Sequence, residues 1–260
     1  MDKPVLISGC EPGIVQVTLN RPDAFNSLSQ AMLDALKDEL AKIAADTSIK
    51  VVILAAAGKA FCAGHDLKEM RAEPSLEYYQ QLFRCCSDVM MTIQRLPQPV
   101  IAQVQGVATA AGCQLVAMCD LAVSADNAKY AVSGVNLGLF CATPSVALSR
   151  NISRKQAMYM LLTGEFIDAN QARDWGLINT VVKPEALAQE TLQLAQKILA
   201  KPQPALQLGK RLFYEQIESN IERAYELASQ TMACNMMDDS ALEGVQAFIE
   251  KRPASWSSTN

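Results

Sequence analysis

Three apolar runs, the first two followed by loops that contain small residues, constrain the fold of this chain most. The runs are residues 51–55, Val100–Val104 and Leu121–Ala125, and each has the length and apolar character of a buried strand. Helix-like stretches separate them. Strands that alternate with helices in this way favour an α/β fold with a mainly parallel sheet. The repeated order also predicts that the small-residue loops face one common cleft.

Local patterns place the remaining elements. Strands over 5–7 and Ile14–Leu19 flank a Glu-Pro-Gly turn and predict a hairpin near the start. Helices are predicted over 29–45, from the loop after 66 to 95, over 112–119, from 204 to about 230, and over 239–251. We therefore expect an α/β core over residues 1–200 and a C-terminal helical region over residues 201–260.

Charge and hydropathy exclude several classes of protein. The net charge is -4, and no Lys/Arg cluster marks a nucleic-acid-binding face. The apolar stretch 115–123 is interrupted by Asp120 and is shorter than the ~20 residues of a membrane span. The first nine residues show neither a signal nor a transit pattern. These observations predict a cytoplasmic protein that binds neither nucleic acid nor membrane.

Cysteine and histidine usage argues against disulfides and metal. The eight cysteines lie within apolar runs, which predicts reduced and mostly buried thiols. His65 is the only histidine, and no Cys/His group has the spacing of zinc ligands, so no metal site is expected.

Two segments carry the most specific motifs. Residues 59–70 read KAFCAGHDLKEM, and residues 106–121 read GVATAAGCQLVAMCDL. In this order and spacing they resemble the signature of the enoyl-CoA hydratase/isomerase, or crotonase, family. The likeness extends to LNRP at 19–22 and DWGLI at 174–178, so it covers nearly the whole chain. It implies a crotonase-type spiral of repeated ββα units, with C-terminal helices that assemble a homotrimer or a dimer of trimers.

The resemblance also implies an oxyanion hole, in which two main-chain NH groups polarise a thioester carbonyl. By position, the donors are the amides of His65 and Ala111. Small residues at 110–112 suit this role, because a backbone NH reaches a ligand closely only where no side chain intervenes. The imidazole of His65 is interpreted as belonging to a surface loop residue that contributes only its main chain.

By the same resemblance, CoA enters as part of the substrate, and no permanently bound cofactor is expected. The residues that match the family's CoA-binding positions are Arg21, Ala24, Ala63, His65, Asp66 and Leu67. Arg21 has two interpretations, a phosphate contact or a structural loop cation. Three acids nearby are interpreted as structural: Asp66 as a helix cap, Glu69 as a solvated helix residue and Asp120 as a hydrogen-bond hub.

The chain departs from the family at the positions that move protons. Hydratases of the family use two glutamates, and the matching residues here are Gln114 and Gly134. A carboxylate that hydrolase and dehalogenase relatives carry is replaced by Ala142. Decarboxylase relatives place a tyrosine where Cys141 stands, and Cys141 itself is interpreted as a neutral buried thiol because no second histidine exists to activate it. Catalytic roles, if any, fall to His65, Ala111, Gln114 and Gly134.

Three functions remain open from these residues. The first is an acyl-CoA enzyme of the lyase or isomerase class, in fatty acid metabolism, with nonstandard active-site residues and weak or absent hydratase activity. The second is a catalytically silent acyl-CoA-binding protein. The third is a decarboxylase of a malonyl-type CoA thioester, for which Gly134, Phe140, Cys141 and Ala142 would line an apolar pocket.

Overall fold

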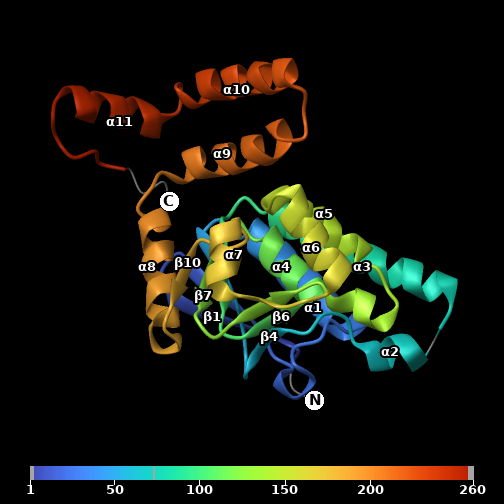
Figure 1. Cartoon of the computed structure of the whole chain (residues 1–260). Coiled ribbons are helices and arrows are strands. Elements are labelled where there is room, and N and C mark those ends of the chain that lie inside the picture. The colour runs from blue at the N-terminus through green and yellow to red at the C-terminus, as the bar shows by residue number, and fades with distance from the viewer. Residues whose placement is uncertain (1–2, 73, 257–260) are drawn as a thin grey trace.

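A six-stranded sheet forms the centre of the molecule (Figure 1). The structure, a computed structural model, describes residues 3–72 and 74–256. The strands, in their order across the sheet, are β1 (Val5–Glu11), β2 (Ile14–Leu19), β3 (Val51–Ala56), β5 (Val100–Val104), β7 (Leu121–Ala125) and β10 (Thr180–Val182). Only the β1–β2 hairpin is antiparallel. The predicted hairpin and mainly parallel sheet are confirmed.

A second, smaller sheet places the loops that matter for function. Its strands, in order, are β4 (Ala60–Cys62), β6 (Val107–Thr109), β8 (Lys129–Ala131) and β9 (Ile167–Asp168). Three times the chain passes from the large sheet to the small one and then into helical structure, as β3 to β4, β5 to β6 and β7 to β8. This confirms the expected repetition of ββα units. Because β4, β6 and β8 are parallel neighbours, the residues that follow them lie at one edge.

Helices cover both faces of the large sheet. Up to residue 199 the helices are α1 (Gln30–Ala45), α2 (Leu67–Ala72), α3 (Leu76–Arg95), α4 (Ala111–Met118), α5 (Ala142–Asn151), α6 (Arg154–Thr163), α7 (Ala169–Trp175) and α8 (Leu187–Leu199), of which α1 and α8 contact the large sheet directly. As predicted, α1 begins after Ser29, whose side chain accepts a hydrogen bond from the Met32 amide. The predicted helix up to Arg95 is instead two helices, α2 and α3.

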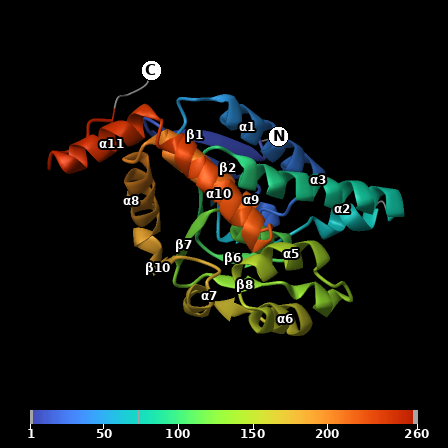
Figure 2. The same ribbon diagram turned by 90° about the horizontal axis from the view of Figure 1, so that it is seen from above.

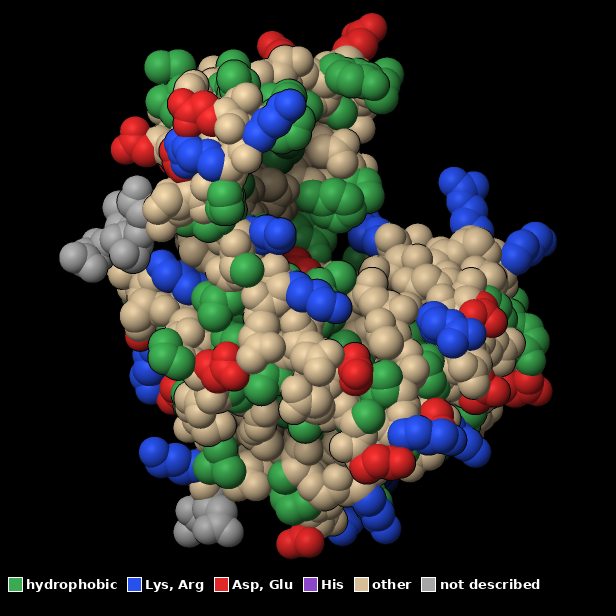
Figure 3. Space-filling view, turned by 90° about the vertical axis from the view of Figure 1, so that its left-hand side faces the viewer, with side chains coloured by type: hydrophobic (Ala, Val, Ile, Leu, Met, Phe, Trp, Pro, Cys, Tyr) green, Lys and Arg blue, Asp and Glu red, His purple; other side chains and the backbone are tan. Residues whose placement is uncertain are grey.

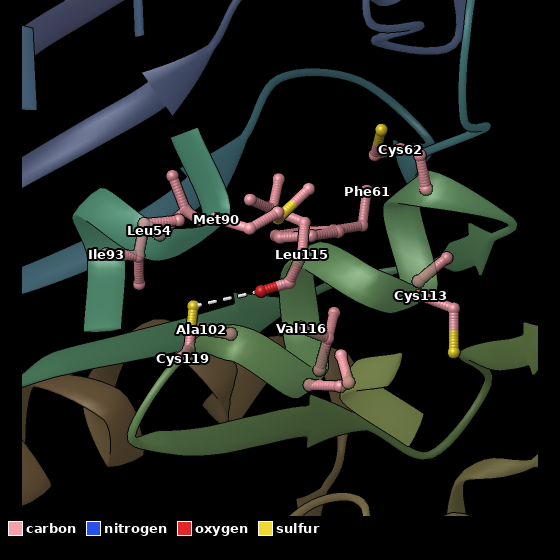
Figure 4. Packing of buried hydrophobic residues seen from close by; sticks show 14 of the residues in the cluster. Leu54, Phe61, Cys62, Met90, Ile93, Ala102, Cys113, Leu115, Val116 and Cys119 are labelled. Atoms are coloured by element: carbon pink, nitrogen blue, oxygen red, sulfur yellow. Dashed lines mark hydrogen bonds between the residues drawn. The ribbon is translucent and has the colours of Figure 1, made fainter. Parts of the chain in front are cut away.

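The alternation of side chains along β3 explains how two cores form. Val52 and Leu54 point into the larger core, whereas Val51 and Ile53 pack with α8 on the opposite face. In the larger core, α3 and α4 pack against each other (Figure 4), with Met90 and Ile93 of α3 near Leu115 of α4. Of these two helices, α4 also packs against β4 and β6 of the small sheet, which carries the loops.

The last three helices form a C-terminal arm outside this core (Figures 1 and 2). They are α9 (Gln203–Gln216), α10 (Ile221–Asn235) and α11 (Asp239–Ile249). The prediction of a single long helix up to about 230 is wrong. The first helix ends with α9, and Asn220 caps α10 by accepting a hydrogen bond from the Arg223 amide. The division of the chain at residue 200 stays a prediction, and residues 257–260 of that region lie outside those described.

Two further sequence expectations concern the thiols and the membrane. All eight cysteines are free, and five of them are buried, which confirms reduced and mostly buried thiols. Within the described residues, no helix combines the length and the apolar character needed to cross a bilayer.

The close packing of α4 on β4 generates a stability prediction. A Cβ added at Gly112 would lie 2.0 Å from the Cys62 carbonyl oxygen, whereas one added at Gly209 in α9 would meet nothing within 4 Å. We expect Gly112→Ala to lower the free energy of unfolding by roughly 1–3 kcal/mol or more through overpacking. Gly209→Ala should raise it by roughly 0.5–1 kcal/mol, since alanine is the better helix former. Urea unfolding of both variants tests this, and equal effects would contradict the packing described.

Candidate functional site

Three loops meet at the edge of the small sheet, one after each of its parallel strands. A Cβ added at Gly64, after β4, would lie 2.9 Å from the Ala110 Cβ and 3.4 Å from the Ala111 nitrogen, after β6. The hydroxyls of Thr109 and Ser133 lie 3.0 Å apart and join the second loop to the third. The structure therefore brings together the regions of His65, Ala111 and Gly134, as the resemblance predicts.

Ala110 holds an unusual backbone conformation at the start of α4. Its φ of 50° and ψ of -120° are rarely adopted by a residue with a side chain, and such a conformation costs about 1–3 kcal/mol. The Ala110 amide donates to the Ala131 carbonyl at 2.9 Å, which fixes the turn to β8. This turn sets the direction in which α4 begins and therefore the orientation of the Ala111 amide.

The amides of His65 and Ala111 are free to bind a ligand. Within residues 3–72 and 74–256, neither NH donates a hydrogen bond to a protein acceptor, while their neighbours do: the Asp66 amide donates to Leu28 and the Gln114 amide to Ala110. Ala111 also begins α4, where the first-turn amides have no intrahelical partner and the helix dipole is positive. Two such donors on adjoining loops are able to polarise a carbonyl oxygen.

The imidazole of His65 is not the surface group that the sequence predicts. Its ring packs edge-on against Phe83 of α3, with ring centroids 5.4 Å apart. Both ring nitrogens are buried; neither makes a hydrogen bond of good geometry within the described residues, although the Leu28 backbone lies near enough to favour the protonated ring slightly. Burial lowers the pKa of His65, so the ring is neutral at pH 7. The ring is therefore partly covered by α3 rather than free in solvent, while the expectation that His65 acts only through its main chain stays a prediction.

The residues predicted to bind CoA lie on two joined loops. The Ala63 amide donates to the Phe25 carbonyl at 3.0 Å, beside Ala24, and the Leu28 amide donates to Gly64 at 2.7 Å. Leu67, at the start of α2, is exposed. These contacts place Arg21, Ala24 and residues 63–67 on one continuous surface.

Arg21 has a structural role in this surface. Its guanidinium donates to the Ser27 carbonyl at 2.8 Å and to the Asp66 carboxylate at 3.0 Å. Of its two interpretations, the structural cation is the one that the contacts support. Burial raises the pKa of Asp66, but the hydrogen bonds from Arg21 and the Glu69 amide outweigh it, and the net pKa is lowered.

The two acids in α2 and the preceding loop cap helices. Asp66 accepts from the Lys68 and Glu69 amides and so caps α2, as predicted. Glu69 is not simply solvated, because its carboxylate accepts from the Gln30 amide at 2.9 Å and caps α1. This contact joins residues 39 positions apart, which no local pattern reveals.

Gln114, at the first glutamate position, lies one helical turn after Ala111. Its side chain is only 5% exposed, and its Oε1 has no donor among the described residues. The side chain faces a cavity of about 990 Å³ between α3, α4, α5 and α9. An amide there donates and accepts hydrogen bonds but does not transfer a proton at neutral pH.

Gly134, at the second glutamate position, has no room for a side chain. A Cβ there would lie 2.7 Å from the Leu139 carbonyl oxygen and 2.8 Å from the Cys141 sulfur. The Gly134 amide donates to that sulfur at 3.2 Å. Cys141 is buried, and burial raises the pKa of its thiol, which confirms the predicted neutral thiol.

The pocket predicted from Gly134, Phe140, Cys141 and Ala142 differs from the cavity described. That cavity is lined by Thr143, but by none of these four residues. Phe140 is 53% exposed. The prediction assumed that residues close in sequence line the same pocket. In the structure, residues 137–140 are exposed before α5 begins.

Asp120 is the hydrogen-bond hub that the sequence predicts. Its carboxylate accepts from the Val100 amide at 2.7 Å, from Lys210 Nζ at 2.6 Å and from the Tyr214 hydroxyl at 2.8 Å. Burial, and then the Asp120 charge, raise the pKa of Tyr214, so its hydroxyl remains a donor. Tyr214 thereby ties α9 to its own core.

The sequence analysis missed the cavity and the contribution of α9 to it. Met90, Met91 and Met118 line one side, and Leu208 and Lys210 of α9 line the other. These three methionines, two in α3 and one in α4, are the sequence feature that could have indicated an apolar cavity here. Within the described residues, no three His, Cys, Asp or Glu side chains are grouped as metal ligands.

The fold and these loops match a known family of proteins. The family described as enoyl-CoA hydratase/isomerase matches residues 9–259. The chain therefore belongs to the enoyl-CoA hydratase/isomerase family, as its motifs suggest.

Solved structures and curated relatives agree with this assignment. A crystal structure of an enoyl-CoA hydratase from Mycobacterium smegmatis superposes with a TM-score of 0.97 at 62% identity, covering 98% of this chain and 99% of that one. Human enoyl Coenzyme A hydratase domain-containing protein 3 gives 0.93 at 44% identity, covering 97% and 100%. The mouse mitochondrial protein of that name is 45% identical over 95% of this chain and 82% of its own length.

These relatives correct the predicted location. Proteins from mouse, rat and human that match 94–95% of this chain are named mitochondrial, so the expectation of a cytoplasmic protein is wrong. That expectation came from the absence of a targeting pattern in the first nine residues. Such an absence does not decide where a protein works.

The buried ring of His65 generates a pH prediction. Its pKa is lowered in the folded state, so below about pH 6.5 the unfolded chain binds more protons than the folded one. The free energy of unfolding should therefore fall as pH is lowered from about 7.5 to 5.5, and His65→Gln should remove most of this loss. Because the chain has one histidine, NMR titration of its imidazole gives a direct check. A folded-state pKa at or above 6.5 would contradict the burial described.

Proposed function

We propose that this chain binds acyl-CoA thioesters and polarises their carbonyl oxygen with the amides of His65 and Ala111. The observation that carries the proposal is that these unpartnered donors lie on adjoining loops, with Gly64 against Ala110 and Ala111. Family membership supports it, and one relative, from Syntrophomonas wolfei, is named crotonyl-CoA hydratase at 32% identity.

The chemistry follows from where negative charge develops. A thioester oxygen gains charge as an enolate forms at the neighbouring carbon, and a donor already aimed at it is worth about 2.7–4 kcal/mol. The positive end of the α4 dipole acts in the same direction. The strain at Ala110 and the tight packing of Gly112 hold one donor in place before a substrate arrives.

The CoA portion of the substrate would lie along the joined loops at 21–28 and 63–67. Ala24, Ala63, His65, Asp66 and Leu67 would contact it, while Arg21 holds the two loops together through Asp66. CoA would enter and leave with each substrate, so we propose no permanently bound cofactor.

Ordinary hydration should be weak or absent. Gln114 is a neutral amide, and Gly134 is closed off by Leu139 and Cys141. A hydratase needs groups at these positions to move protons, and each such group contributes roughly 10²–10⁴-fold. We propose an enzyme of the lyase or isomerase class with nonstandard residues. The same two observations favour one second candidate, a catalytically silent acyl-CoA-binding protein.

The C-terminal arm would assemble the chain as a homotrimer or a dimer of trimers. Its helices expose large apolar side chains, more than a solvated helix pair normally carries. The exposed residues are Phe213, Ile217, Ile221, Tyr225, Met232, Met237, Phe248 and Ile249. We propose that a neighbouring subunit covers them.

A matched pair of ligands tests the polarised carbonyl. Butyryl-CoA and S-butyl-CoA, its thioether, differ only in the carbonyl oxygen. Two hydrogen bonds of roughly 0.5–1.5 kcal/mol each should make the thioester bind about 5- to 150-fold more tightly. Isothermal titration calorimetry measures both affinities, with free CoA as the reference. Equal affinities would mean that the carbonyl is not recognised.

Turnover assays test the missing acid and base. We expect little hydration of crotonyl-CoA, and we expect Gln114→Glu to raise the rate at least tenfold, within the ~10²–10⁴-fold of one such group. Gln114→Met is the control and should not raise it. If crotonyl-CoA is hydrated rapidly and Gln114→Ala does not change the rate, the assignment of the site residues is wrong.

A wider panel of thioesters distinguishes the catalytically silent binding protein from the enzyme. Crotonyl-CoA, a malonyl-type CoA and saturated acyl-CoAs would each be tested for binding and for turnover. Binding of all three classes without turnover of any would favour the silent protein over the enzyme.

A further inference from the structure

One side-chain contact fixes the end of β6, from which the chain turns into α4. Thr109 is the last residue of β6, and its hydroxyl lies 3.0 Å from the hydroxyl of Ser133, two residues after the end of β8. Within the described residues, neither hydroxyl makes any other hydrogen bond. We call these two residues the hydroxyl pair. The pair joins the loop that leads to Ala111 to the loop that holds Gly134.

The direction of the Ala111 amide is set by the peptide groups on either side of Ala110. The Ala110 carbonyl accepts from the Gln114 amide at 3.1 Å, which is the first hydrogen bond of α4. In a trans peptide the following N–H points the opposite way, so the Ala111 donor is directed away from the helix. The Ala110 amide itself donates to the Ala131 carbonyl at 2.9 Å. A shift of the end of β6 would therefore turn the Ala111 donor.

The end of β6 also sets the distance between the two proposed donors. A Cβ added at Gly64 would lie 3.2 Å from the Thr109 carbonyl oxygen and 3.4 Å from the Ala111 nitrogen. His65 directly follows Gly64, so its loop packs on the same short piece of backbone. The φ of 50° at Ala110 persists only where the surroundings hold it. The hydroxyl pair supplies a restraint at the residue just before it.

The hydroxyl pair lies outside the cavity described above. Both residues are half-buried, and neither lines the space of about 990 Å³ between the core and α9. Figure 3 shows the molecule hollowed between the C-terminal arm and the core. A change in the pair would therefore act on a bound carbonyl through the backbone, and not by altering the volume of the cavity.

From these contacts we infer that Thr109 is a positioning residue, whose hydrogen bond with Ser133 holds the amides of Ala111 and His65 in line with one thioester oxygen. The inference rests on the proposed function and adds two positioning residues to it. Neither hydroxyl needs to touch the substrate. Because a hydrogen bond weakens steeply as its angle departs from linear, a small turn of one amide lowers carbonyl recognition and leaves CoA binding intact.

Two variants that each remove one hydroxyl test the inference. Thr109→Val keeps the branched shape of threonine, and Ser133→Ala removes the partner. Calorimetry on the full-length protein gives the affinity for butyryl-CoA relative to that for S-butyl-CoA. Each variant should lower this ratio roughly 2- to 13-fold, as expected when one hydrogen bond to the carbonyl is lost. The affinity for S-butyl-CoA should change less than twofold, which also shows that the variant is folded.

A double variant, a rescue and a matched control separate the hydroxyl pair from other effects. If the two hydroxyls act as one unit, Thr109→Val with Ser133→Ala should lower the ratio no further than either change alone. Thr109→Ser restores a hydroxyl and should return the ratio to within twofold of the unaltered protein. Thr191→Val is the control, because the Thr191 hydroxyl donates to the Leu187 carbonyl within α8, and it should leave the ratio unchanged.

Infrared spectroscopy measures the polarisation of the carbonyl directly. Butyryl-CoA labelled with a heavy carbon isotope at the thioester carbonyl gives a band that can be followed in the complex. Binding to the unaltered protein should lower its stretching frequency, and Thr109→Val should return the frequency part of the way to that of free butyryl-CoA. A variant that only loosened the fold would weaken both ligands without moving this band.

The outcomes separate this inference from the function on which it rests. If the unaltered protein binds butyryl-CoA and S-butyl-CoA equally, the proposed function itself fails. If it discriminates between them and both single variants keep the full ratio, only the inference fails. The inference is also overturned if the effects of the two variants multiply, or if S-butyl-CoA affinity falls as far as butyryl-CoA affinity, since the role of the hydroxyl pair is then only structural.

Discussion

The contact of the first turn of α4 with the backbone of β4 is the constraint on which the rest of the site depends. Gly112 approaches the Cys62 carbonyl so closely that a side chain would meet the oxygen at 2.0 Å. This contact sets where α4 begins, and the unusual backbone of Ala110 follows from the need to turn from β6 into a helix so placed. The parallel pairing of β4 with β6 then brings the loop of His65 alongside. Two unpartnered amides on adjoining loops are thus a consequence of sheet pairing and one tight helix contact.

The same loops separate two parts of catalysis that usually occur together. Backbone donors remain where the fold places them, because main-chain NH groups do not depend on the side chain. Proton carriers do depend on it, and here one position holds an amide while the other is sealed by Cys141 and Leu139. A glutamate side chain at position 134 would fit only if residues 139–141 moved. Gln114, by contrast, lines the cavity, and a glutamate of similar shape would fit at its position. Positions 114 and 134 therefore differ in how readily each could hold a carboxylate.

Much of the fold was predictable because its signals are local. The strands at 100–104 and 121–125, the cap at Ser29 and the small-residue tract at 110–112 were read directly from pattern and composition. What local patterns could not reveal are contacts between distant residues: Glu69 with the Gln30 amide, Tyr214 with Asp120, and the His65 ring against Phe83. The break between α9 and α10 was missed because the apolar periodicity continues through 217–220, where Asn220 starts a new helix. The roles of the site residues remain predictions, since the contacts describe their placement and not their chemistry.

A helix without fully buried residues, α9, forms a wall of the cavity. No residue of α9 is fully buried, and the helix is tied to the core by Lys210 and Tyr214 at Asp120 and by the exposed pair of Arg150 with Glu218. The exposed pair adds little stability in water, so the buried hub at Asp120 carries most of the attachment. Anything that fills the space between α9 and α4 must add apolar contacts to both helices. A ligand that bound only with α9 in this position would stabilise that position by mass action, so filling the cavity and holding α9 on the core would be thermodynamically linked.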